Sequence, residues 1–311
     1  MFWSISESRT FKRCQRQWYY KNFLASPTAK DPVRHNAYLL GKLQSISAWR
    51  GNLVDDVISK AVLPAVRSRR TVNLGQARQN AREMFGRQLA FARRHALHEP
   101  GLRPTQLEGE FAAFYCMEYG GVIPEDEVAR AWDEVESALG NFFGMRELAS
   151  ELKSAKYLVC QRALSFSHSG MTVRAVPDAV VFYDDAPPLI VDWKVHAFGL
   201  QEAWTQLATY AIALTRCSPH SDFPTSFGRW KVTDVRLAEA QLLTNQVRRY
   251  ALSEEDVERA DAYIAQSVTQ MLLATEGRKN SELKAEDFPV AASPEICQRC
   301  PYRKLCWEEP S

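Results

Sequence analysis

The sequence has no long apolar run and no strong imbalance of charge. None of its apolar stretches approaches the roughly 20 residues that a membrane-spanning helix needs. The formal net charge is only +2, so any attraction to nucleic acid or to a membrane must come from local patches. The opening residues MFWSISESRTFKRC lack the charged-then-apolar order of a signal peptide, from which we expect a cytoplasmic protein without membrane contact.

The composition is that of an ordinary globular protein. The 311 residues are 46% apolar and 24% charged, which excludes a disordered or fibrous chain and allows one large domain or two ordinary ones. There are seven cysteines, and in a reducing cytoplasm clustered cysteines bind metal more often than they form disulfides. Three of them, Cys297, Cys300 and Cys306, have the spacing C-x2-C-x5-C.

Periodicity and turn residues predict a helical first half and a mixed second half. Ser4 and Glu7 have the spacing of a capping box, which starts a helix through about residue 22. A second helix is expected over residues 45–66, followed by an all-helical segment over 67–150. The other expected elements are strands over 157–166, 171–183, 189–195 and 230–243, helices over 200–215 and 253–275, and a loop-like tail from 276.

Two acids and a lysine lie in and beside the apolar strands of VPDAVVFYDDAPPLIVDWKVH. Alternation along a strand places Asp192 and Lys194 on one face and Trp193 on the other. Folding back at the turn over residues 184–188 brings Asp178 opposite Asp192 or Trp193. Two carboxylates so placed repel unless a divalent cation lies between them, and oxygen ligands suit Mg²⁺ or Mn²⁺. The alternative is a structural salt bridge of Lys194, because D-x-K is a common tripeptide.

Pro177-Asp178 followed by Asp192-Trp193-Lys194 resembles the PD-(D/E)XK signature of the restriction-endonuclease-like superfamily. Three further features are similar to its RecB-like branch. Gln206 and Tyr210, in WTQLATYAIAL, match the Q-x3-Y motif of the helix after the catalytic strand. The opening SISESRTFKRCQRQWYY resembles the first helix of that branch, with Gln15 where proline is usual. The segment GNLVD resembles a G-x-x-[VIL]-H motif, with Asp55 in the place of a metal-binding histidine.

The resemblance implies an α/β protein with a restriction-endonuclease-like αβββαβ core, a large helical insertion and an iron–sulfur staple joining the chain ends. It implies that Asp178 and Asp192 bind Mg²⁺ or Mn²⁺ for the hydrolysis of DNA, with Asp55 as third ligand and the Trp193 carbonyl as fourth. Lys194 would assist the attacking water, while Gln206 and Tyr210 position the DNA strand or the lysine. His196 is an alternative imidazole ligand, although a surface histidine is the simpler interpretation.

The cysteine triplet needs a fourth ligand. In the iron–sulfur subgroup of RecB-like nucleases, which includes AddB-type and CRISPR-associated exonucleases, that ligand comes from the first helix. The resemblance therefore implies a [4Fe–4S] cluster bound by Cys14, Cys297, Cys300 and Cys306. Four thiolates suit structural Zn²⁺ equally well, and Cys14 alone could be a small core residue. The other cysteines, Cys116, Cys160 and Cys217, are expected to be buried and inert.

We expect four segments: N-terminal helices over residues 1–66, a helical insertion over 67–150, a nuclease core over 151–275 and a cysteine segment over 276–311. Nine arginines between Arg67 and Arg103 could follow a DNA backbone, or form a solvated helix face. Trp18, Tyr19 and Tyr20 could stack on the bases of a single strand, or pack in the interior.

Together these features predict a metal-dependent DNA exonuclease or end-processing nuclease that acts on single strands or duplex ends. Enzymes of this kind serve DNA repair and antiviral defence, often beside a helicase, so a helicase or other repair or defence protein is the expected partner. One alternative is a nuclease-like module that binds DNA or a partner without cutting, which the aspartate at position 55 favours. Another is a zinc-stapled enzyme of a different class in which D-x-K is a coincidence.

Overall fold

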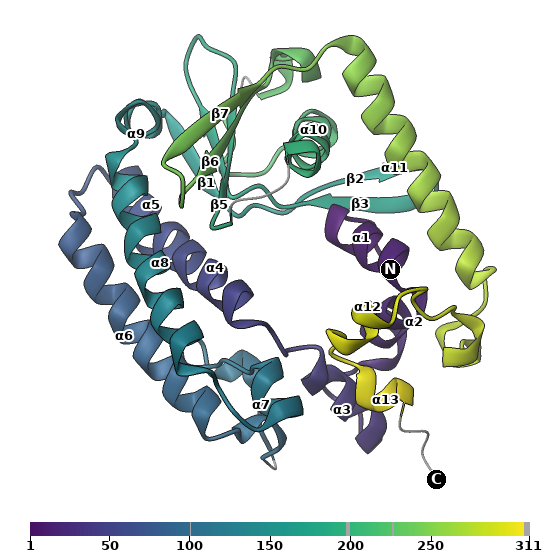
Figure 1. Ribbon diagram of the computed structural model, residues 1–311. Helices are drawn as coiled ribbons and strands as arrows, with labels where there is room; N and C mark the ends of the chain where they lie inside the picture. Colours follow the sequence, from purple (N-terminus) through teal and green to yellow (C-terminus); the bar gives the residue numbers. More distant parts are fainter. Residues whose placement is uncertain (100, 197–199, 226, 308–311) are drawn as a thin grey trace.

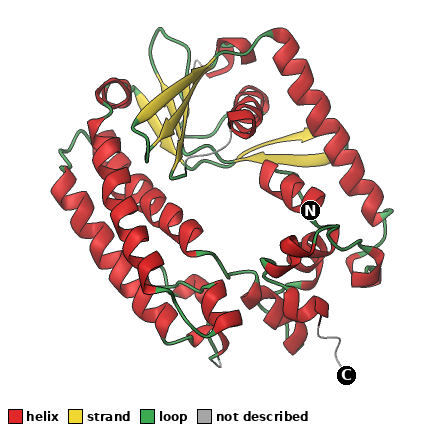
Figure 2. Ribbon diagram, in the orientation of Figure 1, coloured by secondary structure: helices red, strands yellow, loops and turns green. Residues whose placement is uncertain are grey.

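The computed structural model describes residues 1–99, 101–196, 200–225 and 227–307. A five-stranded mixed sheet lies between two groups of helices, and a separate two-stranded hairpin extends away from it (Figures 1 and 2). The helices are α1 (Ile5–Arg13), α2 (Gln15–Tyr19), α3 (Pro32–Leu40), α4 (Ile46–Val57), α5 (Leu63–Arg67), α6 (Leu74–Arg93), α7 (Tyr115–Gly120), α8 (Glu125–Gly144), α9 (Arg146–Lys153), α10 (Leu200–Arg216), α11 (Glu254–Thr275), α12 (Pro294–Gln298) and α13 (Arg303–Trp307). The strands are β1 (Tyr157–Cys160), β2 (Leu164–His168), β3 (Met171–Ala175), β4 (Ala179–Phe182), β5 (Leu189–Lys194), β6 (Arg236–Gln241) and β7 (Gln246–Tyr250). This mixed α/β architecture confirms the expected α/β class, while the iron–sulfur staple stays a prediction.

The sheet has the strand order β1-β4-β5-β6-β7. Strands β5 and β6 run parallel, because α10 lies between them in the chain, and the other neighbours are antiparallel. The prediction missed β7 and started β6 several residues too early. A pair of short 3₁₀ turns precedes β6 instead of strand.

The two strands expected over residues 157–166 and 171–183 are each divided in two. Their outer halves pair as β1 and β4 in the main sheet, and their inner halves pair as β2 and β3 in the separate hairpin. The break after β1 lies at Gln161, whose φ of 47° is left-handed, and the break before β4 contains Pro177, which has no N–H to give to a ladder. Asp178 lies at this bend, directly before β4.

Each face of the sheet packs against a different group of helices. Val191, Trp193 and Ala238 share one hydrophobic cluster with residues of α4, α6 and α8. Ile190 and Leu237, on the opposite face, share another with residues of α1, α10 and α11. Helix α4 lies before the expected boundary at residue 66, and α6 and α8 lie after it, yet all three pack in one cluster. The boundary between the first two segments stays a prediction.

The expected first helix begins where predicted but is interrupted. The Ser4 side chain accepts a hydrogen bond from the Glu7 amide and caps α1. Glu7 does not complete the capping box, because its buried carboxylate binds Lys21 and Asn22 instead. The helix breaks at Cys14, whose backbone is extended with φ of −162°, before α2 and a π-helical turn continue to residue 24.

The second predicted helix contains a π-helical turn over Ile58–Val62, between α4 and α5. There the Leu63 amide donates to the Ile58 carbonyl, five residues earlier. Pro64 follows at the start of α5. Proline in a regular α-helix clashes with the carbonyl four residues before it, so the wider turn allows the helix to continue.

The C-terminal segment returns to the N-terminal helices. The Arg16 amide donates to the Pro289 carbonyl at 3.1 Å, and the Tyr20 hydroxyl donates to the Leu305 carbonyl at 3.2 Å. The expected loop-like tail contains two short helices, α12 and α13, which lie beside α2 and α3 (Figure 1). No helix in the described ranges is both long enough and apolar enough to span a membrane.

Candidate active site

Asp178 and Asp192 meet across the antiparallel pair β4–β5. Ala179 pairs with Val191, so the register continues to Asp178 opposite Asp192. The backbone N–H of Trp193 donates to Asp178 Oδ2 at 2.8 Å, which fixes this carboxylate beside the end of β5. The predicted hairpin pairing is therefore present in the structure.

Asp192 and Lys194 lie on the same face of β5, as strand alternation predicts. Lys194 Nζ lies 2.6 Å from Asp192 Oδ2, and only 2% of the Asp192 side chain is exposed. Although the ion pair is close, Asp192 Oδ2 accepts no hydrogen bond of good geometry from the part of the chain that the structure describes. A buried carboxylate oxygen that lacks such a donor is suited to a metal ligand.

The helix α10 carries Gln206 and Tyr210 to the same place. Gln206 Nε2 donates to Asp192 Oδ1 at 3.1 Å, and Gln206 Oε1 accepts from Lys194 Nζ at 3.3 Å. The same amide nitrogen donates to the Tyr210 hydroxyl at 2.5 Å. The two residues are one helical turn apart, so their side chains lie on one face of α10. The sequence motif thus places both residues beside the acids.

Asp55 approaches from the other side of β5, on α4. Its Oδ1 accepts a hydrogen bond from the Trp193 indole at 2.8 Å, and its Oδ2 accepts one from the Gln161 side chain at 2.6 Å. Asp55, Asp178, Asp192 and Lys194 line one open cavity of about 500 Å³. The structure therefore brings all three candidate carboxylates to one cavity, while two neighbours fix the orientation of Asp55.

The site disfavours the charged forms of its three carboxylates. Burial, together with the charges of Asp192 and Asp55, raises the pKa of Asp178 well above its usual value. Burial also raises the pKa of Asp192, against the opposing effect of Lys194, and raises the pKa of Asp55. Burial and the nearby acids likewise raise the pKa of Tyr210, which keeps its hydroxyl neutral. A divalent cation among these oxygens would relieve both the repulsion and the cost of burial, so the donor set fits such an ion.

His196 and Trp193 also line this cavity. His196 is exposed at the end of the strand, as expected for a surface histidine. The Trp193 side chain points to the opposite face of β5, where it packs edge-on against Phe142 of α8 at 6.1 Å. Its backbone carbonyl remains a predicted ligand.

Three residues that support the site have no counterpart in the sequence motifs. Arg50, on α4 and 8% exposed, binds the Glu134 carboxylate and the Val195 carbonyl, which ties α4 to α8 and to the end of β5. Gln161 orients Asp55 from the loop after β1. Neither residue stands out in the sequence, because each acts on a neighbour more than 80 positions away.

The third residue, Glu239, could have been found. It lies on β6 in register with Asp192 and is 1% exposed. Its carboxylate accepts hydrogen bonds from Gln241 at 2.6 Å and from the Tyr250 hydroxyl at 2.8 Å, and Arg248 lies 3.6 Å away. An acid in the apolar strand RLAEAQ is the same signal that singled out Asp192.

The four candidate cluster cysteines line a second cavity. These cysteines are Cys14, Cys297, Cys300 and Cys306. Arg16 and Arg303 line the same cavity. Burial raises the pKa of Cys300 to about 12, and the neighbouring thiols add to the effect. Four thiols from the two ends of the chain fit a metal ion or cluster bound by thiolates. Binding would ionise the thiols, and the two arginines would offset the resulting negative charge.

The aromatic residues near this cavity do not offer a stacking surface. Trp18, Tyr19 and Tyr20 are at most 7% exposed. Trp18 packs edge-on against Phe11 at 5.0 Å, and Tyr19 stacks on Phe288 at 5.0 Å. The suggestion that these side chains stack on nucleic-acid bases is therefore wrong, because they form part of the core.

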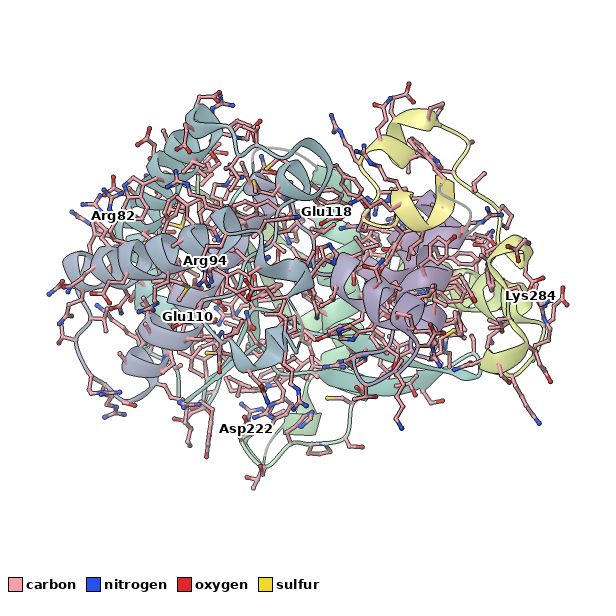
Figure 3. The ribbon with its side chains drawn as sticks, turned by 90° about the horizontal axis from the view of Figure 1, so that it is seen from below. Arg82, Arg94, Glu110, Glu118, Asp222 and Lys284 are labelled. Atoms are coloured by element: carbon pink, nitrogen blue, oxygen red, sulfur yellow. The ribbon has the colours of Figure 1, made fainter. Side chains whose placement is uncertain are left out.

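Four of the nine arginines of the arginine-rich run lie on α6, and the other five lie before or after it. Figure 3 shows Arg82 and Arg94 on the helical side of the molecule, far from Lys284. Arg82 covers the Trp132 ring at 4.3 Å, and Arg93 forms two hydrogen bonds of 2.7 Å with the Glu125 carboxylate. These local contacts explain part of the run, and a role in binding DNA stays a prediction.

Comparison with known proteins places the chain in a family. A solved structure titled "Crystal structure of SSO0001" matches this chain with a TM-score of 0.29 and 12% sequence identity, over 63% of this chain and 80% of that chain. None of the curated proteins matches the sequence. A family model described as the PD-(D/E)XK nuclease superfamily matches residues 2–307. That match covers nearly the whole chain and confirms the resemblance at the level of the superfamily: the chain belongs to the PD-(D/E)XK nuclease superfamily.

Proposed function

We propose that the protein is a divalent-metal-dependent DNA nuclease of the RecB-like branch, acting as an exonuclease or on DNA ends. Membership of the superfamily indicates a metal-dependent nuclease with DNA as its substrate. The observation that carries the proposal is the meeting of Asp178, Asp192 and Lys194 at one cavity, where the buried Asp192 Oδ2 is paired with Lys194 at 2.6 Å.

Asp178 and Asp192 would hold Mg²⁺ or Mn²⁺, with Asp55 as third ligand and the Trp193 carbonyl as fourth. When bound, the ion would supply Lewis-acid chemistry at the scissile phosphodiester. Each aspartate is oriented by a neighbour: Trp193 donates to both Asp178 and Asp55, and Gln206 donates to Asp192. Preorganised ligands of this kind lower the cost of assembling the site.

Lys194 would orient the attacking water and offset the negative charge that develops on the phosphate. Its ammonium group is held between Asp192 and the Gln206 carbonyl oxygen. Tyr210 fixes the Gln206 amide, because its hydroxyl accepts from Gln206 Nε2. Gln206 and Tyr210 thus act as positioning residues for the acid and the lysine.

A cleavage assay tests this proposal. Labelled single-stranded and duplex DNA are incubated with anaerobically purified protein and Mg²⁺ or Mn²⁺, and the products are resolved by length. We expect cleavage by the wild type, and at least a ~100-fold loss for Asp192→Ala and for Lys194→Ala. The matched control is Asp185→Ala, an exposed acid of the β4–β5 turn, which should cleave normally. Equal cleavage by all four proteins would exclude this site.

A module that binds DNA without cutting is the competing proposal, favoured by the aspartate at position 55. Asp55→His and Asp55→Ala separate the two. If Asp55 is a ligand, Asp55→Ala loses activity, whereas Asp55→His retains activity and shifts the preference from Mg²⁺ towards Mn²⁺, because imidazole suits transition metals better. DNA binding without cleavage by the wild type in either metal would favour the module.

We further propose that Cys14, Cys297, Cys300 and Cys306 bind a [4Fe–4S] cluster that joins the two ends of the chain. Their convergence on one cavity supports the proposal, and the contacts of Arg16 and Tyr20 with the C-terminal segment are consistent with it. Protein purified without oxygen should be brown and contain iron and sulfide, while Cys300→Ser loses the colour and Cys116→Ser keeps it. A colourless protein containing zinc would replace the cluster with structural Zn²⁺.

A further inference from the structure

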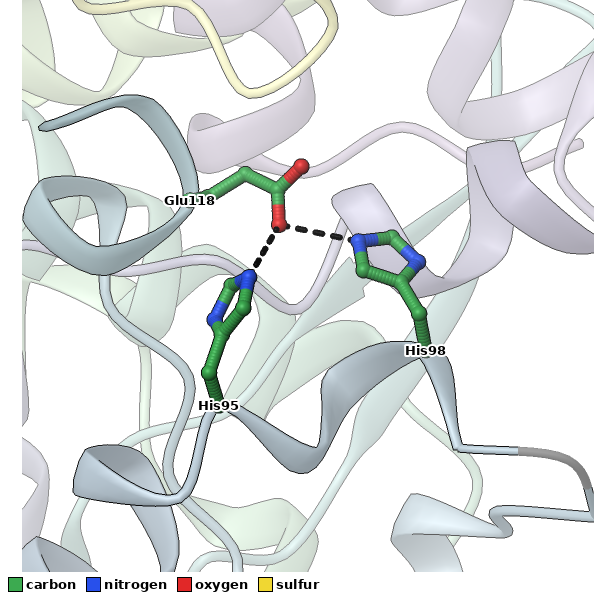
Figure 4. Close-up of side chains that lie close together, drawn as sticks. All are labelled: His95, His98 and Glu118. Atoms are coloured by element: carbon green, nitrogen blue, oxygen red, sulfur yellow. Dashed lines mark hydrogen bonds and ion pairs between the residues drawn. The ribbon is translucent and has the colours of Figure 1, made fainter. Parts of the chain in front are cut away.

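Three side chains of metal-ligand type, none of which lines the carboxylate cavity, meet at the junction of the helical region with the cysteine segment. His95 follows α6, His98 ends a 3₁₀ turn, and Glu118 lies on α7. Glu118 Oε2 lies 2.9 Å from His98 Nε2 and 3.5 Å from His95 Nε2 (Figure 4). The three ligand atoms all lie within 4.8 Å of one another.

The burial of these side chains suits an ion that enters from solvent. Glu118 is only 1% exposed and forms the floor of the group, whereas the His95 and His98 side chains are 38% and 43% exposed. His95 has a left-handed backbone, with φ of 51° and ψ of 41°. Such a conformation is unfavourable for a residue other than glycine, and here it accompanies the approach of the imidazole to Glu118.

The other oxygen of Glu118 is already occupied. Lys304 Nζ donates to Glu118 Oε1, which leaves Oε2 directed towards the two imidazoles. A carboxylate that binds metal through one oxygen commonly accepts a hydrogen bond on the other, which fixes its orientation. Lys304 lies between Cys300 and Cys306, so this hydrogen bond connects the group to the cysteine segment.

Two further contacts strengthen the same junction. The hydroxyl groups of Tyr115 and Tyr119, on either side of Glu118, donate to the Arg299 and Pro301 carbonyls at 2.6 Å each. Helix α7 thus holds the C-terminal segment through three side chains, those of Tyr115, Glu118 and Tyr119. An ion at Glu118 would fasten the end of α6 to α7 and so make this support more rigid.

We propose that His95, His98 and Glu118 form a second metal site, which binds Zn²⁺ or a similar transition-metal dication and stabilises the junction of the helical region with the cysteine segment. Zinc takes imidazole nitrogen and carboxylate oxygen at about 2.0–2.2 Å, which separates neighbouring ligands of a tetrahedral ion by about 3.4 Å. The measured separations of 2.9 and 3.5 Å from Glu118 Oε2 need only small side-chain movements. Water would complete the coordination on the exposed side. Two nitrogen ligands disfavour Mg²⁺, so the site differs in metal preference from the carboxylate site.

Zinc content and thermal stability test this proposal on the full-length protein with its cysteine site filled with iron. The variant is His95→Ala/His98→Ala, and the matched control is His35→Ala/His220→Ala, which removes two histidines elsewhere. After equilibration with buffered Zn²⁺ and removal of excess, we expect wild type and control to retain one more Zn²⁺ per chain than the variant. Zinc should also raise the Tm of the wild type and control by about 3 °C or more, and leave that of the variant unchanged. Equal zinc content and equal shifts in all three proteins would overturn the proposal and leave an ion-pair network.

A second measurement needs no variant and is unaffected if the double substitution impairs folding. X-ray absorption at the zinc edge distinguishes nitrogen and oxygen neighbours near 2.0 Å from sulfur neighbours near 2.3 Å. We expect the retained zinc of the wild type to show two imidazoles and no sulfur. Purely sulfur coordination would assign the zinc to the cysteines and reject the histidine site.

Discussion

The carboxylate of Asp178, which lies at the bend that divides a long β-hairpin in two, accepts the backbone N–H of Trp193 on the neighbouring strand β5 at 2.8 Å. This hydrogen bond holds an acid from before β4 next to the two charged residues at the end of β5. Because the bend interrupts the ladder at this point, Trp193 N–H is available to a side chain. The break that the strand prediction missed is therefore part of what forms the site.

The first prediction concerns the stability of the metal-free protein. Asp178→Asn removes the carboxylate whose pKa is raised by burial and by the charges of Asp192 and Asp55, and the asparagine oxygen can still accept from Trp193. We expect the free energy of unfolding in chelator to rise by about 1 kcal/mol, measured by urea denaturation. Asp185→Asn, in the exposed turn, should change it by less than about 0.5 kcal/mol.

With added Mg²⁺ or Mn²⁺, the wild type should become more stable than Asp178→Asn. The wild type gains stability by binding the ion, while Asp178→Asn loses a ligand and gains little. A variant that is less stable than the wild type in chelator would show that the acids do not oppose one another in the folded state.

The second prediction separates two positioning residues. Gln206→Ala removes the donor to Asp192 and the acceptor for Lys194, so we expect a roughly 10–100-fold loss in kcat. Tyr210→Phe removes only the acceptor for Gln206, so the loss in kcat should be smaller. Single-turnover cleavage measures both, with KM for DNA little changed. Gln79→Ala, on the exposed surface of α6, serves as control; a loss confined to KM would indicate DNA binding instead of positioning.

The third prediction concerns Arg50, whose buried guanidinium binds Glu134 and the Val195 carbonyl. Arg50→Met should lower the free energy of unfolding by about 3 kcal/mol, because it leaves a carboxylate and a carbonyl without their donor. The double variant Arg50→Met/Glu134→Leu should recover part of this loss, since both charges are removed. A change below about 1 kcal/mol in the single variant would show that the ion pair contributes little.

The fourth prediction is a pH dependence. Burial raises the pKa of both Cys160 and Cys217 to about 11, so at pH 8 only about one thiol in a thousand is the reactive thiolate. We expect alkylation of these two cysteines in the native protein to be slow at pH 8 and to accelerate about tenfold per pH unit up to pH 10. Mass spectrometry locates the labelled residues, and denatured protein provides the fast reference. Rapid labelling of both cysteines at pH 8 in the native protein would contradict their raised pKa.

Several parts of the fold followed from local sequence. The capping box of Ser253 and Asp256 set the start of α11, and apolar periodicity gave α10 to within a residue. Helix α1 began at its Ser4 cap, but the same motif misassigned Glu7, whose carboxylate is bound by Lys21 and Asn22. Caps act over three or four residues and can be read directly, whereas the partner of a buried charge depends on packing.

The sequence by itself determined that Asp192 and Lys194 share a face, that Asp178 lies across the turn from them, and that Gln206 and Tyr210 lie one helical turn apart. These relations follow from the fixed periods of strands and helices. Only the tertiary structure decided that Asp55 is held by the Trp193 indole, that Arg50 braces the end of β5, and that Glu118 meets His95 and His98. Those contacts join separate elements, and their geometry depends on how whole helices pack against the sheet, which no local pattern of residues encodes.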